Sequence, residues 1–311
     1  MSERSPAALT AGALERVEVR APAKLNVGLR LLSRRSDGYH EIETVFVPLD
    51  LCDELRLEWS LEPGIELRVR GAELPTGSEN LAVRAAEAAC SALEIEPRLR
   101  IELEKRIPVA AGLGGGSSDA AAVLLGVEAL AGRALSRAER AALALELGAD
   151  VPFFLEPCPA LGRGRGERLE PLEAVAERWW VLVALPFGIS TAWAYRAASA
   201  ELTLPREPSS IAALLGPWGL PSSPSNDLEA VAERCHPQIG ALRRALERAG
   251  AAMTGMSGSG PTVFGGFEKR GGAEAAAREV ALPEGARAMA IRSPSSRQSR
   301  SSDNGWGVAK W

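Results

Sequence analysis

The chain has 311 residues and a mass of 32.8 kDa, which exceeds the usual size of a single core, so we expect two domains. Its formal charge of −4 and its hydrophobic content of 46% exclude a mostly disordered chain and leave no basic field for a nucleic acid. No apolar stretch approaches the roughly 20 residues of a spanning helix, and the charged residues Glu3 and Arg4 lie where a signal peptide would have an apolar core. We therefore expect a cytoplasmic protein without a membrane partner. We also expect a monomer or a weak homodimer.

The first regular pattern in the chain predicts a β-hairpin. Residues 24–31 alternate polar and apolar side chains, which is typical of a half-buried strand, and the period of two places Lys24 and Asn26 on the same face. Ser36-Asp37-Gly38 provides the residue types of a tight turn. The two residues just past this turn are Tyr39 and His40.

The patterns that follow predict a sheet with helices in the first domain. The capping box at Ser136 and Glu139 starts one of the helices, which we expect to end at Gly148. The expected strands are 43–49, 55–59, 65–69 and 99–103, and the other expected helices are 80–93 and 119 to about 130.

The second half of the chain has the order β-α-β-β-α-β, which indicates a ferredoxin-like domain over 174–311 after a first domain over 1–173. We expect Asn226-Asp-Leu-Glu229 to cap one of its helices. Ser293–Ser302 is rich in Ser and Arg without apolar periodicity and is expected to be mobile, whereas Gly305–Trp311 is apolar enough to dock. The expected strands are 181–185, 251–254, 262–267 and 286–291, with helices between 191 and 250 and near 273–280.

A glycine-rich loop connects the strand 99–103 to the following helix. Four glycines within Gly112–Gly116 allow a close approach of backbone to a ligand, and Ser117 and Ser118 begin a helix whose free N–H groups favour an anion. A side chain at Gly115 is expected to lie against phosphate oxygens. The alternative is a flexible turn with a serine cap, but the strand, loop and helix context favours a phosphate cradle.

Other common sites are excluded by missing residues. The loop has no Lys of the P-loop pattern, it does not fit the G-x-G-x-x-G fingerprint of dinucleotide-binding dehydrogenases, and Gly255-Met-Ser257-Gly-Ser259 does not fit the nucleophile elbow. The four cysteines contain no C-x-x-C pair and the chain has two histidines, so a zinc cluster is not supported. The chain has only four lysines, which suggests that Arg does not serve where Lys is used.

Three motifs in chain order resemble those of the GHMP kinases. They are Pro22-Ala-Lys24-Leu-Asn26, the Gly112–Ser118 loop and Gly255-Met-Ser-Gly-Ser-Gly-Pro261. Within this superfamily, three further segments are similar to the branch of 4-diphosphocytidyl-2-C-methyl-D-erythritol kinases, which act in non-mevalonate isoprenoid biosynthesis. These segments are Ser36-Asp-Gly-Tyr-His40, Gly148-Ala-Asp150-Val-Pro-Phe-Phe154 and Asn226-Asp-Leu-Glu229. The resemblance covers roughly residues 17–292.

The resemblance implies an α+β fold with two lobes, the first like domain 2 of ribosomal protein S5 and the second ferredoxin-like. It implies transfer of the γ-phosphate of ATP, with Mg²⁺, to the 2-hydroxyl of a cytidine diphosphate substrate. Lys24 and Asp150 are the expected catalytic residues. The ATP-binding loop would comprise Pro108, Val109, Ala110, Ala111, Gly112, Leu113, Gly114, Gly115, Gly116, Ser117 and Ser118, and the substrate would contact Asn26, Tyr39, His40, Thr191 and Tyr195.

The residue types suit these roles. Phosphoryl transfer needs positioning, charge neutralisation and an acceptor for the hydroxyl proton, and a carboxylate such as Asp150 held near an ammonium such as Lys24 stays ionised. An imidazole offers one donor and one acceptor to a pyrimidine edge, and aromatic rings offer stacking faces. Taken singly, Asp150 can be a turn residue, Lys24 a solvated strand charge and His40 a surface hairpin residue. We assign no protein ligand to a metal; the candidate ligand is the hydroxyl of Ser117 or Ser118.

Two other functional hypotheses compete with this one. A homoserine or mevalonate-type kinase would share the glycine loop but bind a small acid or alcohol without a base, and the segment Asp37-Gly-Tyr-His40 distinguishes it. A noncatalytic nucleotide-binding module would keep the loop but could lose Lys24 or Asp150, and both are present.

Overall fold

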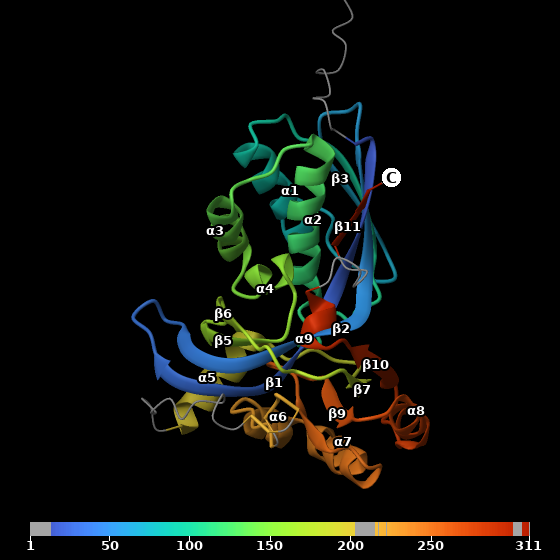
Figure 1. Ribbon diagram of the computed structural model, residues 1–311. Coiled ribbons are helices and arrows are strands. Elements are labelled where there is room, and N and C mark those ends of the chain that lie inside the picture. Colours follow the sequence, from blue (N-terminus) through green and yellow to red (C-terminus); the bar gives the residue numbers. More distant parts are fainter. Residues whose placement is uncertain (1–13, 203–214, 217, 222, 301–306, 311) are drawn as a thin grey trace, which may run out of the picture.

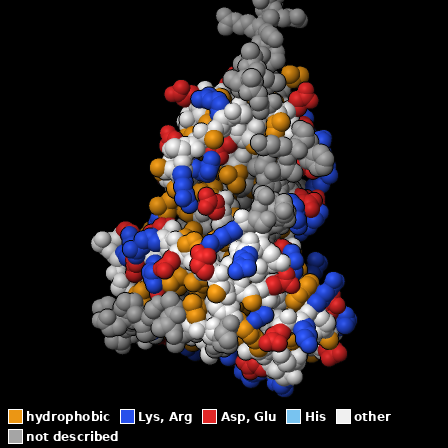
Figure 2. Space-filling view, viewed as in Figure 1, with side chains coloured by type: hydrophobic (Ala, Val, Ile, Leu, Met, Phe, Trp, Pro, Cys, Tyr) orange, Lys and Arg blue, Asp and Glu red, His pale blue; other side chains and the backbone are white. Residues whose placement is uncertain are grey.

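In the computed structural model, the chain forms two lobes joined by long curved strands (Figure 1). The structure describes residues 14–202, 215–216, 218–221, 223–300 and 307–310. Among these residues, no helix is long and apolar enough to cross a membrane. On the face shown in Figure 2, acidic and basic side chains are interspersed.

The first lobe is a seven-stranded sheet with helices packed on one face (Figure 1). Strands β1 and β2 are paired antiparallel over most of their lengths and curve from this lobe into the second. The helices bury small and branched residues against the sheet, which allows α2 to run through the middle of the lobe. The elements are β1 (Arg16–Arg34), β2 (His40–Trp59), β3 (Gly64–Arg70), α1 (Leu81–Ala92), β4 (Arg98–Glu104), α2 (Gly115–Ala131), α3 (Arg137–Leu147), α4 (Val151–Leu155), β5 (Ala160–Gly164) and β6 (Arg168–Pro171).

The second lobe has a four-stranded sheet in the order β10-β7-β9-β8, the antiparallel arrangement of a ferredoxin-like domain. Strands β7, β8 and β9 are mostly buried and the edge strand β10 is half-buried, and the helices of this lobe pack apolar faces on the sheet. The two-lobed α+β fold is therefore confirmed. The elements are β7 (Arg178–Ala184), α5 (Thr191–Glu201), α6 (Glu229–Cys235), α7 (Gln238–Arg248), β8 (Met253–Met256), β9 (Val263–Phe267), α8 (Arg270–Glu279) and β10 (Arg287–Ser293).

A separate cluster of buried side chains holds the two lobes together. Leu25 of β1 and Val47 of β2 belong to the same buried cluster as Trp180 of β7 and Phe264 of β9. The rings of Trp180 and Phe264 meet edge to face with their centroids 5.6 Å apart. Because both long strands of the first lobe contribute to this cluster, the lobes share a core rather than a flexible tether.

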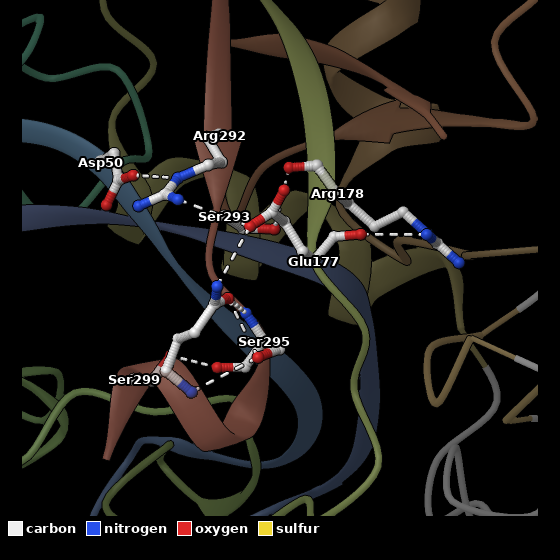
Figure 3. Close-up of polar contacts among 8 residues, drawn as sticks. Asp50, Glu177, Arg178, Arg292, Ser293, Ser295 and Ser299 are labelled. Carbon is white, nitrogen blue, oxygen red and sulfur yellow. Dashed lines mark hydrogen bonds and ion pairs between the residues drawn. The ribbon is translucent and has the colours of Figure 1, made fainter. Parts of the chain in front are cut away.

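The end of β10 and the segment after it pack on the chain between β6 and β7 (Figure 3). Arg292 donates to Asp50 of β2 over 2.5 Å and lies 3.4 Å from Glu177. A short helix α9 (Ser296–Ser299) follows, capped by Ser295 and Gln298, and the Ser296 hydroxyl donates to the carbonyl of Leu172 over 2.6 Å. The expectation that this segment is mobile is wrong for residues 293–300, because hydroxyl groups here replace apolar periodicity as the source of order. Residues 301–306 lie outside the described residues.

The C-terminal strand β11 (Gly307–Lys310) returns to the first lobe and pairs antiparallel with β1. The expected docking of the last segment is therefore confirmed for these four residues. The first sheet thus contains strands from both halves of the chain. The expected boundary between the two domains after residue 173 stays a prediction.

Three local expectations differ from the structure. The expected strands 43–49 and 55–59 form the single strand β2, because β1 pairs with it along both parts. The β5–β6 hairpin was not expected, since glycines and charges hide its alternation. Asn226-Asp-Leu-Glu229 does not cap α6, whose N-cap position is Leu228 without a side-chain bond, because other elements use these polar side chains.

Candidate active site

A cleft of about 970 Å³ opens beside the glycine loop, between the hairpin turn of β1 and β2 and the first turn of α5. Its walls come from both lobes. All of the expected site residues line it except Ser118, which is fully buried. Sequence segments separated by more than 200 residues therefore meet at one place.

Lys24 and Asp150 face each other in this cleft. The Lys24 ammonium lies 3.4 Å from the Asp150 carboxylate and also donates to the side-chain oxygen of Asn26. Lys24 and Asn26 therefore share a face of β1, as expected, and both are buried. The Asp150 side chain is 34% exposed, and although it occupies the N-cap position of α4 it makes no capping bond there. Its carboxylate is thus open to a ligand and held beside a fixed positive charge.

The loop of the third motif packs directly against this pair. A Cβ at Gly258 would lie 2.9 Å from the side-chain oxygen of Asn26, so only glycine allows the approach. The Ser257 hydroxyl accepts from the backbone N–H of Asn26 over 3.1 Å and donates to the carbonyl of Gly112 over 2.9 Å. One serine therefore joins the third motif to both of the others.

Asn226 and Glu229 hold that loop from behind. The Asn226 amide donates to the carbonyls of Met256 and Gly258 over 2.8 and 2.7 Å, and the Glu229 carboxylate accepts from the N–H of Met256 over 2.8 Å. These residues were expected to serve a helix cap. Their structural role is instead to fix the loop beside Asn26.

The glycine loop turns into α2 through a left-handed residue. Gly114 has φ of 74°, and a Cβ there would lie 2.7 Å from the Phe154 ring. A Cβ at Gly115 would meet Ile107 and Lys105 at 3.1 and 3.2 Å. A side chain at Gly115 would therefore meet the protein itself, and the expectation that it lies against phosphate oxygens stays a prediction.

Gly116 is the residue of this loop that has room for a side chain. It is exposed, and the nearest atom to its Cβ would be Leu81 at 3.8 Å. Because Gly116 and Leu81 both line the cleft, a larger side chain would extend into space that a ligand can use. The free N–H groups at the start of α2 make the same region favourable for an anion.

A buried ionic cluster lies under the loop, and sequence reasoning missed it. The Lys105 ammonium donates to carboxylates of Asp53 and Asp119, the latter over 2.7 Å. Burial raises the pKa of Asp119 to about 7, against the opposing effect of Lys105, and one of its oxygens has no partner. The sequence signal for this cluster was the scarcity of lysine, because Lys105 is one of only four lysines in the chain.

The end of the cleft opposite the glycine loop carries three aromatic rings. The rings of His40 and Tyr195 lie 5.6 Å apart at 32°, and Tyr39 is 57% exposed at the hairpin turn. Burial and the charge of Arg34 lower the pKa of His40, so its imidazole is neutral at pH 7, and its Nε2 is buried without a partner. Burial, followed by the charge of Asp150, raises the pKa of Tyr195.

A second set of cleft residues was absent from the sequence expectations. These residues line the cleft from the start of α1 and the segment before it. The Asn80 amide donates to the Pro75 carbonyl over 2.8 Å and shapes this end. No motif signals them, because most are apolar and Asn80 serves as a helix cap; they are Leu74, Pro75, Glu79, Asn80 and Leu81.

Comparison with known proteins agrees with this arrangement. Residues 80–156 match the model of the GHMP kinases N terminal domain, and residues 211–283 match that of the GHMP kinases C terminal domain. A 4-diphosphocytidyl-2-C-methyl-D-erythritol kinase of Citrifermentans bemidjiense is 42% identical over 90% of this chain and 99% of its own length. The chain belongs to the 4-diphosphocytidyl-2-C-methyl-D-erythritol kinase family of GHMP kinases. The family expected from the motifs is thus confirmed.

Other relatives support the same assignment. The kinase of that name from Moorella thermoacetica is 44% identical over 79% of this chain and 88% of its own. A crystal structure of a 4-(cytidine 5'-diphospho)-2C-methyl-D-erythritol kinase superposes with a TM-score of 0.73 at 39% identity, covering 88% of this chain and 98% of that one. A homoserine kinase from Cytophaga hutchinsonii shares only the fold, with a TM-score of 0.66 at 19% identity over 95% of this chain and 97% of its own.

Proposed function

We propose that this chain transfers the γ-phosphate of ATP to the 2-hydroxyl of 4-(cytidine 5'-diphospho)-2-C-methyl-D-erythritol. The observation that carries the proposal is the Lys24–Asp150 pair, in a cleft that has a glycine loop on one side and aromatic rings on the other. The identity of 42% to a kinase named for this substrate supports it. Homoserine and mevalonate-type kinases share the fold without needing the aromatic end.

In the proposed reaction, Asp150 accepts the proton of the substrate hydroxyl as its oxygen attacks the γ-phosphorus. Lys24 and the N–H groups at the start of α2 neutralise negative charge on the transferred group. The Lys24 ammonium also lies 3.4 Å from the Asp150 carboxylate and holds it in place beside the reacting hydroxyl. The 3.4 Å separation allows both to contact the reacting atoms.

ATP is proposed to lie along the glycine loop with its base toward Leu74, Pro75 and Leu81, whose apolar side chains suit a purine. Magnesium would accompany the phosphates. The described residues contain no group of three or more acidic, His or Cys side chains that could hold a metal. We therefore propose that phosphate oxygens and water supply most ligands, with the Ser117 hydroxyl in the cleft as the available protein group.

The cytosine of the substrate is proposed to bind between Tyr39 and Tyr195, with His40 at its edge. The support is the buried Nε2 of His40, which has no partner, since a buried polar atom left unsatisfied costs about 1–3 kcal/mol and a base edge would satisfy it. Thr191 lines the same wall and shares a hydrogen bond of 3.0 Å with Ser259.

The test is a measurement of ADP release by the purified chain with Mg-ATP and three acceptors in parallel: the cytidyl substrate, homoserine and mevalonate. We expect turnover with the cytidyl substrate alone. Turnover with homoserine or mevalonate, or ATP hydrolysis equal in all three, would overturn the proposal. Mass spectrometry of the product establishes that one phosphate was added.

A further inference from the structure

Two basic side chains of the cleft have no role in the function proposed above. Four basic residues line it, and two of them are neutralised, Lys24 by Asp150 and Lys105 by its two aspartates. The other two are Arg165 and Arg196. Within the described part of the chain, no ion pair holds either guanidinium.

The turn that carries Arg165 contacts both ends of the proposed acceptor site. Its guanidinium carbon is 4.8 Å from the centre of the Tyr39 ring, which ties the side chain to the aromatic end. The next residue in the β5–β6 turn is Gly166, where a Cβ would lie 3.6 Å from the Asp150 carboxylate. One turn of chain therefore connects the wall that carries Tyr39 with the proposed base.

The environment of Arg165 leaves its charge available. Its backbone N–H donates to Glu167 over 2.5 Å, which fixes the turn without using the side chain. The charge of Arg165 acts weakly on Asp37, whose carboxylate is bound by Arg35 and by the N–H of Tyr39. Arg196 follows Tyr195 on the exposed side of α5, with no contact that ties it to the proposed base.

We propose that Arg165 binds the diphosphate of a pyrimidine nucleoside diphosphate in this cleft. The inference rests on the proposed function for the direction of the ligand, with its base between the tyrosines and its hydroxyl at Asp150. Any ligand that connects these points carries its diphosphate past the turn at Arg165. A planar guanidinium presents two parallel N–H donors to phosphate oxygens, and its stacking on Tyr39 limits the rotamers that must be ordered on binding.

This assignment makes Arg165 a determinant of acceptor specificity. A small acceptor such as homoserine has no phosphate to satisfy an arginine at this place, whereas a nucleoside diphosphate neutralises it. The residue thereby discriminates by the phosphate groups of the ligand, independently of the base edge that faces His40.

The test is calorimetric titration of the whole chain with cytidine and with CDP, for the unmodified protein and for the variants Arg165→Gln, Arg165→Lys and Arg168→Gln. Arg168 is the matched control, because it lies on β6 near the same turn, pairs with Glu41, and its side chain is 63% exposed outside the cleft. We expect Arg165→Gln to weaken CDP binding about 10- to 100-fold while cytidine binding stays within about two-fold. Arg165→Lys should recover part of the loss, and Arg168→Gln should match the unmodified protein.

Each other outcome overturns the inference in a distinguishable way. If Arg165→Gln weakens cytidine and CDP equally, the residue only supports the Tyr39 ring, and the proposed function stands. If CDP binding is unchanged, the diphosphate lies elsewhere, and again the proposed function stands. If the unmodified protein binds neither compound, the cytidine site itself is wrong and the proposed function fails with it.

Discussion

Replacing Asp150 by Asn should separate catalysis from stability. The substitution keeps an amide oxygen beside the Lys24 ammonium, and the Asp150 side chain is 34% exposed with no capping bond to lose. A partly exposed pair of this kind contributes about 1 kcal/mol or less, which corresponds to a melting shift of roughly 2–4 °C at most. Loss of a general base lowers turnover about 10²- to 10⁴-fold, which is about 3–5 kcal/mol in the barrier.

The assay follows ADP release under saturating Mg-ATP and cytidyl substrate, with thermal melting measured on the same samples. Asp50→Asn is the control, because Asp50 is 25% exposed and pairs with Arg292 away from the cleft (Figure 3). We expect Asp150→Asn to lose at least two orders of magnitude in kcat with little change in melting, and Asp50→Asn to stay within a few-fold. Turnover of Asp150→Asn close to that of the unmodified chain would remove Asp150 from the role of base.

Three further predictions follow from contacts in the cleft. Tyr195→Ala should lose about 1–3 kcal/mol of binding for the cytidyl substrate, with ATP affinity unchanged, in paired titrations; equal losses for both ligands would contradict a base stack. Gly116→Val should weaken ATP binding without lowering the melting temperature, whereas Gly115→Val should also destabilise the fold because its Cβ meets Ile107; calorimetry and melting distinguish them. The raised pKa of Asp119 means that the folded state holds its proton more tightly than the unfolded state, so this contribution to stability is lost as pH rises toward 7. Urea unfolding between pH 5 and 7 should therefore show the unmodified protein losing more stability than Asp119→Asn, by up to about 1.4 kcal/mol per pH unit, and parallel curves would contradict this.

Local chemistry determined much of the fold. The capping box at Ser136 and Glu139 depends only on neighbours in the chain and was predicted, as was the helix expected over 80–93 and observed over 81–92. The turn at Gly38 and the alternation of Lys24 and Asn26 are equally local, since a period of two fixes the face on which a side chain lies. The three motifs were sufficient to predict the family.

The tertiary structure decided the interactions between parts of the chain that are far apart in the sequence. The sequence alone could not show that Asn226 fixes a loop 30 residues away, or that Lys105 is balanced by Asp53 from another strand, because such pairs have no spacing rule. The availability of Arg165 is of the same kind, since it depends on the absence of an ion pair to its guanidinium among the described residues, which no local pattern predicts. Local patterns do not determine which distant residues come into contact, because burial and pairing depend on how both lobes pack.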